Sequence, residues 1–277
     1  MTTATDRAIA EIRQSKPLAK HAKKILSLVR PHIHFTPRKG KAADNKLGAS
    51  RLAGEPDLPE GTAWPVGPGF EGEAPMDFIA QIDLDSISRR DVDGLLPKSG
   101  VLAFFVAQNY DGGKVIYGEH DAIVRVPLPV GQRGRRKGAK PPKWGGFDVT
   151  ADMVLPPPWT ELVSSKNRSG TAWNSRTGRR GKGKTLVELA HDAHEIYCQI
   201  YERWLEEFGH AQHGMFGYER MMEGAQKADE LVLLRMDYNN FTAYDFVEVV
   251  SIYWFITEDD LIAGKFDAAE VFCGSTI

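Results

Sequence analysis

Apolar residues at helical spacing predict a helical segment over 5–30. Ile9 and Ile12, and then Leu18, Ala22 and Ile25, fall at helical spacing. Pro17 lies within the run, and proline cannot donate the backbone hydrogen bond that a helix interior requires. We therefore expect the helix to break or kink there.

A second apolar face predicts a longer helix over 187–208, and Gly209 is a suitable residue to end it. The stretch from 50 to 75 is rich in Pro and Gly, which predicts irregular structure instead.

Short segments rich in Val, Ile, Phe and Tyr predict strands, and Gly or Asp turns separate several of them. Asp111-Gly112-Gly113 is typical of a hairpin turn. The predicted strands cover 77–83, 101–107, 114–117, 121–126, 230–237 and 246–256, and 268–274 adds one more.

Two parts of the sequence repeat the same order of features. Each has a Gly, then an apolar segment that ends in Asp, then an aromatic-rich strand. The first copy consists of Gly54, 78–83 and 101–106, and the second of Gly217, 231–237 and 251–256. This order indicates one structural unit used twice.

The phrase that starts at Leu52 (Leu-Ala-Gly-Glu-Pro-Asp-Leu-Pro-Glu-Gly-Thr-Ala-Trp-Pro) and the phrase Phe-Ile-Ala-Gln-Ile-Asp-Leu from Phe78 resemble the YwqG-like family, a bacterial domain-of-unknown-function family. Weaker similarities cover Leu231 to Asp237 and the region near Tyr253. Arg235 stands where the family usually has Gln, and 245–250 lacks the usual Trp-Gly-Asp phrase. The resemblance implies an α+β protein with a twisted, largely antiparallel sheet, and no established activity, cofactor or catalytic residue.

These observations predict an α+β fold with two pseudo-repeated sheet lobes, within one domain over 1–277. Its parts are an N-terminal helical segment (1–40), a first sheet lobe (45–130), basic Gly/Pro-rich insertions (131–184), and a long central helix plus a second sheet lobe (185–277). We expect no membrane span, because no apolar stretch is long enough. Two cysteines among 277 residues make no disulfide framework, which favours reduced thiols and a cytoplasmic location.

The net charge of −2 conceals a strong asymmetry. Residues 131–146 contain six Lys or Arg, and 166–184 contain seven, with no acidic residue in either segment. The remaining chain has 22 basic and 37 acidic residues. The sequence thus predicts an acidic body with two cationic insertions.

The two insertions provide the candidate macromolecule-binding residues. Cationic side chains attract phosphate, and interleaved indoles can stack on bases. The alternative is that both insertions are solvated loops. The candidates are Arg133, Arg135, Arg136, Lys137, Trp144, Trp173, Arg176, Arg179, Arg180 and Lys182.

The segment 178–185 matches the phosphate-loop pattern, with Gly178, Gly183, Lys184 and Thr185 at its key positions. A long predicted helix follows, as the pattern requires. However, the residues before it are polar and cationic, whereas a phosphate loop follows a buried strand. A solvated loop before a helix is the alternative.

Asp83 and Asp237 occupy equivalent places in the repeat and could converge as groove carboxylates. An Asp at a strand end more often bonds its own backbone to make a turn. His191 and His194 on the predicted helix, and His210 and His213 after it, lack zinc-protease spacing. Solvated or hydrogen-bonded histidines explain them better, so we predict no metal site and no cofactor.

The sequence contains no convincing catalytic set. The leading hypothesis is a non-enzymatic binding protein that recognises a macromolecular partner, in a toxin-neutralising or adaptor role. The second hypothesis is nucleic-acid association through the two basic segments. The third hypothesis is an enzyme, either an NTPase using Lys184 and Thr185 or a hydrolase using Asp83 and Asp237. The sequence leaves the oligomeric state open.

Overall fold

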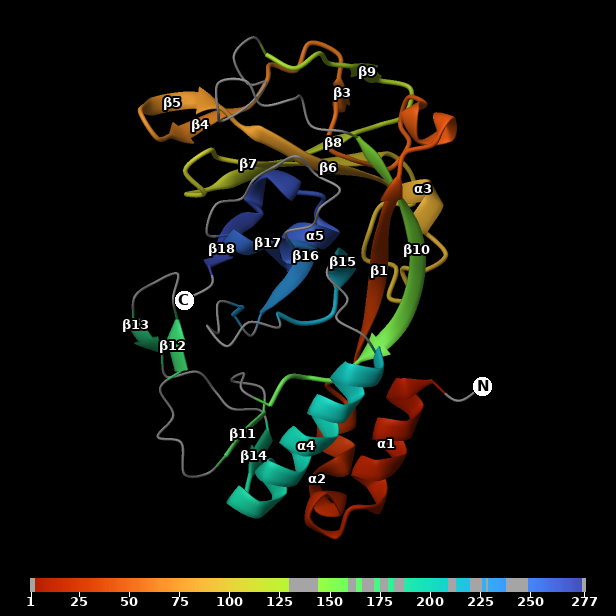
Figure 1. The fold of residues 1–277 in the computed structure, drawn as a ribbon, viewed down its shortest axis with the longest axis vertical. Helices are drawn as coiled ribbons and strands as arrows, with labels where there is room; N and C mark the ends of the chain where they lie inside the picture. The colour runs from red at the N-terminus through yellow and green to blue at the C-terminus, as the bar shows by residue number, and fades with distance from the viewer. Residues whose placement is uncertain are drawn as a thin grey trace. The chain divides into compact units, whose positions relative to one another are not determined.

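The computed structural model describes residues 3–129, 144–158, 163–165, 172–174, 179–181, 187–208, 213–219, 226–227, 229–237 and 249–275. Helices and a large, mostly antiparallel sheet confirm the α+β class (Figure 1). The chain divides into two compact units. The first consists of Met1–His34, Ala151–Ala211 and Met215–Val232, and the second of Phe35–Thr150, Gln212–Gly214 and Leu233–Ile277.

The helices of the first unit are α1 (Ala4–Gln14), α2 (Lys16–Leu26) and α4 (His191–Phe208). Thr3 caps α1 and forms a reciprocal pair of hydrogen bonds with Asp6, at 3.0 and 3.1 Å. Pro17 lies in the first turn of α2, where its missing N–H is not needed. The predicted break is therefore confirmed, and it falls at Ser15.

The apolar faces of these helices form one core, with Ile12, Leu18 and Tyr197 among its buried residues. Figure 1 shows α4 beside α1 and α2. The Tyr197 hydroxyl donates a hydrogen bond of 2.6 Å to the Pro156 carbonyl, and burial raises the pKa of Tyr197 well above its usual value.

Two predicted helix boundaries are wrong. The helical segment predicted over 5–30 ends at Leu26, and strand β1 (Arg30–Lys39) follows. The second helix starts at His191, because Val187–Leu189 forms β14, which pairs in parallel with β11 (Val163–Ser165). Val187 and Leu189 are buried while Glu188 is exposed, which is the two-residue period of a strand.

The main sheet has ten strands in the order β18-β17-β16-β15-β1-β10-β2-β6-β7-β8. Most of the predicted strands are confirmed within one to three residues. The remaining bounds are β2 (Arg51–Leu52), β6 (Asp77–Asp83), β7 (Val101–Val106), β8 (Gly113–Gly118), β10 (Gly145–Val154), β15 (His213–Phe216), β16 (Glu230–Asp237), β17 (Val249–Thr257) and β18 (Glu270–Ser275).

The segment predicted as an insertion over 131–184 contains β10, which lies in the interior of the main sheet between β1 and β2. That part of the prediction is wrong. Gly145, Gly146 and Phe147 are buried, so the Gly pair belongs to a packed strand and not to a loop. The same segment also contains β12 (Ala172–Asn174), which pairs antiparallel with β13 (Arg179–Gly181).

Short elements complete the second unit. Helix α3 (Leu84–Ile87) follows β6, and α5 (Glu258–Ile262) follows β17. Two 3-10 turns are η1 (Ala42–Asn45) and η2 (Phe266–Ala268). Small antiparallel pairs are β3 (Asp57–Pro59) with β9 (Ile123–Arg125), and β4 (Val66–Gly69) with β5 (Gly72–Pro75).

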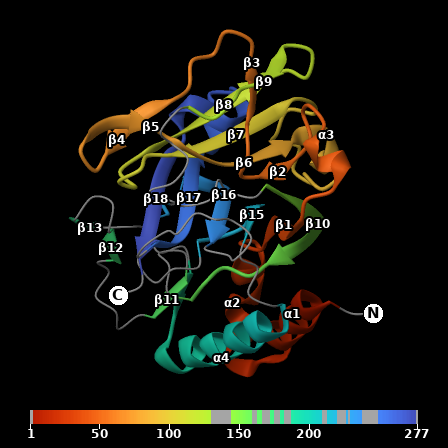
Figure 2. The same ribbon diagram turned by 45° about the horizontal axis from the view of Figure 1, so that its top comes forward.

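Within the second unit, β17 packs against β7. The indole of Trp254 lies 5.4 Å from the Phe104 ring and donates a hydrogen bond of 3.3 Å to the Phe105 carbonyl. Figure 2 shows β16, β17 and β18 side by side. None of the helices in the described part of the chain has the length and apolar character needed to cross a bilayer.

Candidate functional site

The first cluster of polar side chains lies where β6 ends. Asp83 caps the short helix α3, and its Oδ1 accepts a hydrogen bond of 3.1 Å from the Asp85 backbone N–H. The Asp83 backbone N–H in turn donates to Ser50 Oγ at 2.8 Å. The turn function that strand-end Asp residues usually have is therefore confirmed for Asp83.

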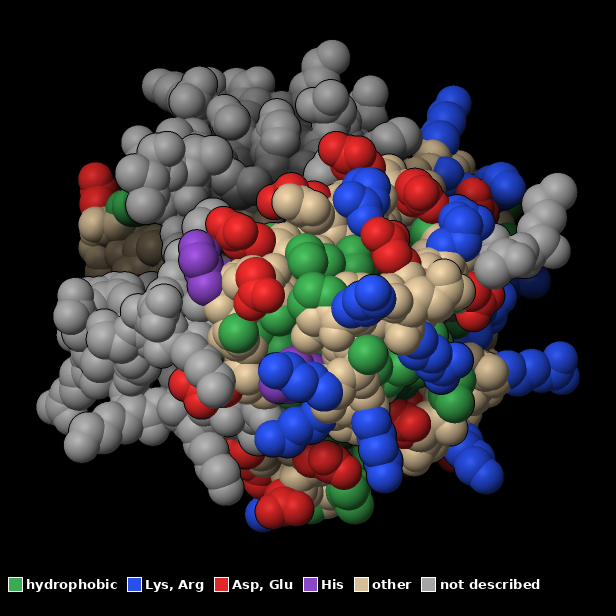
Figure 3. All heavy atoms as spheres, turned by 90° about the horizontal axis from the view of Figure 1, so that it is seen from below, with side chains coloured by type: hydrophobic (Ala, Val, Ile, Leu, Met, Phe, Trp, Pro, Cys, Tyr) green, Lys and Arg blue, Asp and Glu red, His purple; other side chains and the backbone are tan. Residues whose placement is uncertain are grey.

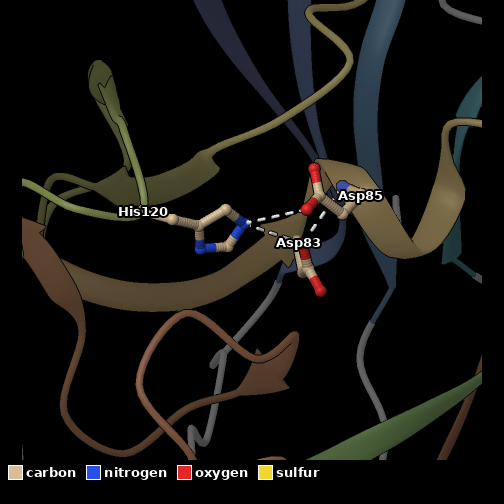
Figure 4. A group of neighbouring side chains, drawn as sticks. All are labelled: Asp83, Asp85 and His120. Atoms are coloured by element: carbon tan, nitrogen blue, oxygen red, sulfur yellow. Dashed lines mark hydrogen bonds and ion pairs between the residues drawn. The ribbon is translucent and has the colours of Figure 1, made fainter.

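His120, in the turn after β8, points toward both carboxylates (Figure 4). Its Nε2 lies 3.2 Å from Asp83 Oδ1 and 3.9 Å from Asp85 Oδ2. The opposite edge of the ring lies against Gly48, where an added Cβ would come within 2.6 Å of Nδ1. The side chain of Asp83 is 22% exposed and that of Asp85 is 56% exposed, so the cluster opens toward solvent on the Asp85 side.

Burial raises the pKa of Asp83, and the nearby His120 partly offsets that rise. Tyr117, on β8, also has a raised pKa. Burial raises the pKa of Tyr117 to about 12, with further contributions from the acceptor Glu119 and from Asp85. The Tyr117 hydroxyl donates to Glu119 at 2.5 Å, and its ring stacks on Phe266. The surroundings of His120 are therefore acidic.

One imidazole nitrogen and two carboxylate oxygens, all within 4.8 Å of one another, form a donor set that Zn²⁺, Mn²⁺ or Fe²⁺ accepts. The ion pairs of His120 with the two carboxylates, and the role of Asp83 as the N-cap of α3, already explain why these three side chains lie together. The cluster is therefore accounted for without a bound cation.

The charges around Asp83 predict that two substitutions shift its pKa in opposite directions. Replacing His120→Ala removes the positive partner and should move the pKa of Asp83 further up. Replacing Asp85→Asn removes a like charge and should move it down. A carbon-detected NMR titration of the Asp83 carboxyl measures both variants, and shifts of the same sign would contradict the description.

Asp237, at the end of β16, has a different set of partners. Its carboxylate accepts from Arg235 at 2.6 and 2.8 Å and from Ser251 Oγ at 2.6 Å. Its backbone N–H donates to His213 Nδ1 at 3.1 Å. In the described part of the chain, Asp83 and Asp237 thus belong to two separate clusters. His213 was predicted to be in a loop, but it is a buried residue of β15.

Many of the predicted binding residues lie outside the described residues: Arg133, Arg135, Arg136, Lys137, Arg176, Gly178, Lys182, Gly183, Lys184 and Thr185, and also His210. Trp173 on β12 pairs in register with Arg180 on β13, and Asn174 pairs with Arg179. The phosphate-loop pattern requires a helix directly after it, but strand β14 lies between the pattern and α4. That expectation is wrong.

Trp144 is the remaining predicted binding residue, and it is 37% exposed. Its indole lies across Gly40, where any Cβ would overlap the ring, and its Cβ lies beside Gly54. Lys39 and Lys41, on either side of Gly40 in the sequence, are exposed and make no ion pair within the described residues. We call Trp144, Gly40, Lys39 and Lys41 the Trp144 surface.

The chain beside the Trp144 surface is held by two charge networks. Arg38 bonds both oxygens of Asp44, at 2.6 and 2.9 Å, and one oxygen of Asp148 at 2.8 Å. These contacts fix η1 against β10. The second network, around Asp57, was not found from the sequence.

The Asp57 carboxylate is fully buried and pairs with both Arg51 and Arg125. It also accepts from the Gly48 backbone N–H and from Gln81 Nε2, each at 2.8 Å. Arg51 and Arg125 additionally donate to backbone carbonyls at Asn45 and Lys46. Asp57 thus ties the 45–48 loop to β2, β6 and β9. The sequence around it is irregular and Pro-rich, so no periodicity marked these charges as buried.

The face drawn in Figure 3 shows Lys and Arg side chains among Asp and Glu side chains. Exposed ion pairs also join helices of the first unit, such as Arg7 with Glu207 at 2.5 Å, and Arg203 with Glu11. The described residues of this face therefore form no large patch of one sign.

The structure defines an α+β protein with a mostly antiparallel ten-stranded sheet. The chain belongs to the family described as Domain of unknown function (DUF1963), whose family model matches residues 50–273. The resemblance to a domain-of-unknown-function family is confirmed at this level. No curated protein matches the chain.

Proposed function

We propose that this chain is a non-enzymatic binding protein that recognises a macromolecular partner, and that the partner contacts the Trp144 surface. The observation that carries the proposal is the position of Trp144, a large indole that is more than one third exposed and backed by the Gly40 backbone. Tryptophan is enriched among the residues that dominate binding at interfaces, because it offers a large apolar area with few rotatable bonds.

The support beneath Trp144 favours a preformed surface. Arg38, Asp44 and Asp57 hold the neighbouring loop through hydrogen bonds to charged groups. A surface that is already ordered loses less conformational entropy when a partner binds. A larger share of the interaction energy then appears as binding free energy.

We also propose that the sheet consists of two pseudo-repeated lobes, and that the chain is a member of the bacterial YwqG-like family. The strand order supports this, since β2-β6-β7-β8 on one side corresponds to β15-β16-β17-β18 on the other. Gln81, two residues before Asp83, pairs with Arg51 of the neighbouring strand. Arg235, two residues before Asp237, likewise pairs with Gly214. Ala53 and Gly54 have positive φ, and so do Phe216 and Gly217. A cytoplasmic location is part of the same proposal, because neither cysteine forms a disulfide.

Two classes of partner fit this surface. A protein in a toxin-neutralising or adaptor role would cover the indole with an apolar side chain. Nucleic acid would stack a base on it, with phosphates near Lys39 and Lys41. The cationic residues that precede Trp144 in the sequence favour an anionic partner of either class.

The proposal predicts that Trp144→Ala abolishes recovery of the partner. The tagged full-length chain is expressed in its native host, purified with and without nuclease, and its bound molecules are quantified. We expect a stoichiometric partner with the unmodified chain and at least a tenfold loss with Trp144→Ala. A partner that survives nuclease is a protein, and one that disappears is held by nucleic acid.

Val92→Ala is the matched control, because Val92 is 73% exposed in the same unit. It should leave recovery unchanged. Equal recovery with Trp144→Ala, at an unchanged melting temperature, would remove the Trp144 surface from the proposal.

A further inference from the structure

We propose that Cys198 is a nucleophilic thiol, that His194 is its general base, and that small electrophiles such as peroxides modify it. Both side chains lie on α4, one turn apart, and Cys198 Sγ is 3.6 Å from His194 Nδ1. The other ring nitrogen, Nε2, lies 2.9 Å from the Pro158 carbonyl oxygen. A nucleophile, a base and a group that orients the base are therefore aligned in the first unit.

The Pro158 carbonyl determines which ring nitrogen carries the proton. A carbonyl oxygen can only accept a hydrogen bond, so Nε2 must be the donor. In the neutral ring, Nδ1 then has its lone pair available and faces the thiol. This is the tautomer that a base for Cys198 requires.

Cys198 is half-buried, so a small reagent can reach it. Besides His194, its titratable neighbours within one turn of α4 are Glu195, Tyr197, Tyr201 and Glu202, and β14 carries the exposed Glu188. Helix α1 places Arg7 and Glu11 against Glu207 and Arg203, and the lysines of α2 are exposed. The nearby carboxylates oppose ionisation of the thiol, and His194 is the base whose ring nitrogen faces it.

The reaction with peroxide balances without a further reactant. His194 Nδ1 takes the thiol proton, and Sγ attacks one peroxide oxygen. The O–O bond breaks, and the departing hydroxide takes the proton from Nδ1 and leaves as water. The sulfur is oxidised to sulfenic acid and the peroxide is reduced.

Cys273 provides a matched comparison, because it is the other cysteine of the chain, is also half-buried and also forms no disulfide. Full-length Cys273→Ser and Cys198→Ser variants each retain one thiol. Their alkylation by iodoacetamide is followed by mass spectrometry from pH 5.5 to 9.5. We expect Cys198 to react about tenfold faster than Cys273 at pH 7, with an apparent pKa below about 8.5.

Adding His194→Ala to the Cys273→Ser variant should raise the apparent pKa of Cys198 and remove its advantage. Labelling of sulfenic acid by dimedone after peroxide treatment should fall in parallel. An unchanged pH profile in the His194→Ala variant would overturn the proposal. If that variant does not fold, slower alkylation of Cys198 than of Cys273 across the pH range overturns it instead.

Discussion

Replacing Asp57→Ala is expected to destabilise the chain by about 3–5 kcal/mol, the usual cost of removing one partner from a buried ion pair. Arg51 is only 1% exposed, and burial lowers the pKa of its guanidinium to about 10 even with Asp57 opposite. Without Asp57 that charge stays in the interior, and the Gly48 N–H and Gln81 Nε2 lose an acceptor. Urea unfolding of the full-length chain, compared at equal m-values, measures the loss.

Glu11→Ala is the control, because it breaks an ion pair with Arg203 in which both side chains are about half exposed. Exposed pairs of this kind contribute less than about 1 kcal/mol. If Asp57→Ala and Glu11→Ala shift the unfolding midpoint equally, Asp57 does not hold a desolvated network. The 45–48 loop beside the Trp144 surface would then have another support.

The sequence pattern found the strands that are rich in apolar residues, such as Asp77–Asp83 and Val101–Val106, because burial of both faces of a sheet leaves that pattern directly in the sequence. It missed β1, whose buried His32, Ile33 and Phe35 lie between Pro31 and Pro37 in a basic segment. It also missed β10, where Gly145 and Gly146 imitate a loop. Both strands depend on neighbours that are distant in the sequence.

In the candidate sites, too, the sequence revealed individual residues and short spacings but not the partners that packing brings from distant positions. Asp83 was identified from its place in the repeat, but its partner His120 is 37 residues away and follows a different strand. The four-residue spacing of His194 and Cys198 is visible in the sequence. The Pro158 carbonyl, which fixes the tautomer, is 36 residues from His194 and is brought there by packing within the first unit.

Trp254→Ala should be the second most damaging substitution, with an expected loss of about 3–5 kcal/mol. Trp254 is fully buried on β17, and it joins this strand to β7 through the Phe104 ring and the Phe105 carbonyl. Removing the indole leaves a cavity between two packed strands and leaves that carbonyl without its donor. Trp254→Phe keeps an aromatic ring at the contact and should lose about half as much.

Ile262→Ala is the matched control on the same unit, because Ile262 is 64% exposed on α5. Exposed substitutions of this kind change stability by about 0.5 kcal/mol or less. Unfolding midpoints in the order Ile262→Ala, Trp254→Phe, Trp254→Ala, from most to least stable, are the expected result. A Trp254→Ala midpoint close to that of Ile262→Ala would mean that β7 and β17 do not share a core. The Trp254 contact would then be unable to hold the two halves of the sheet together.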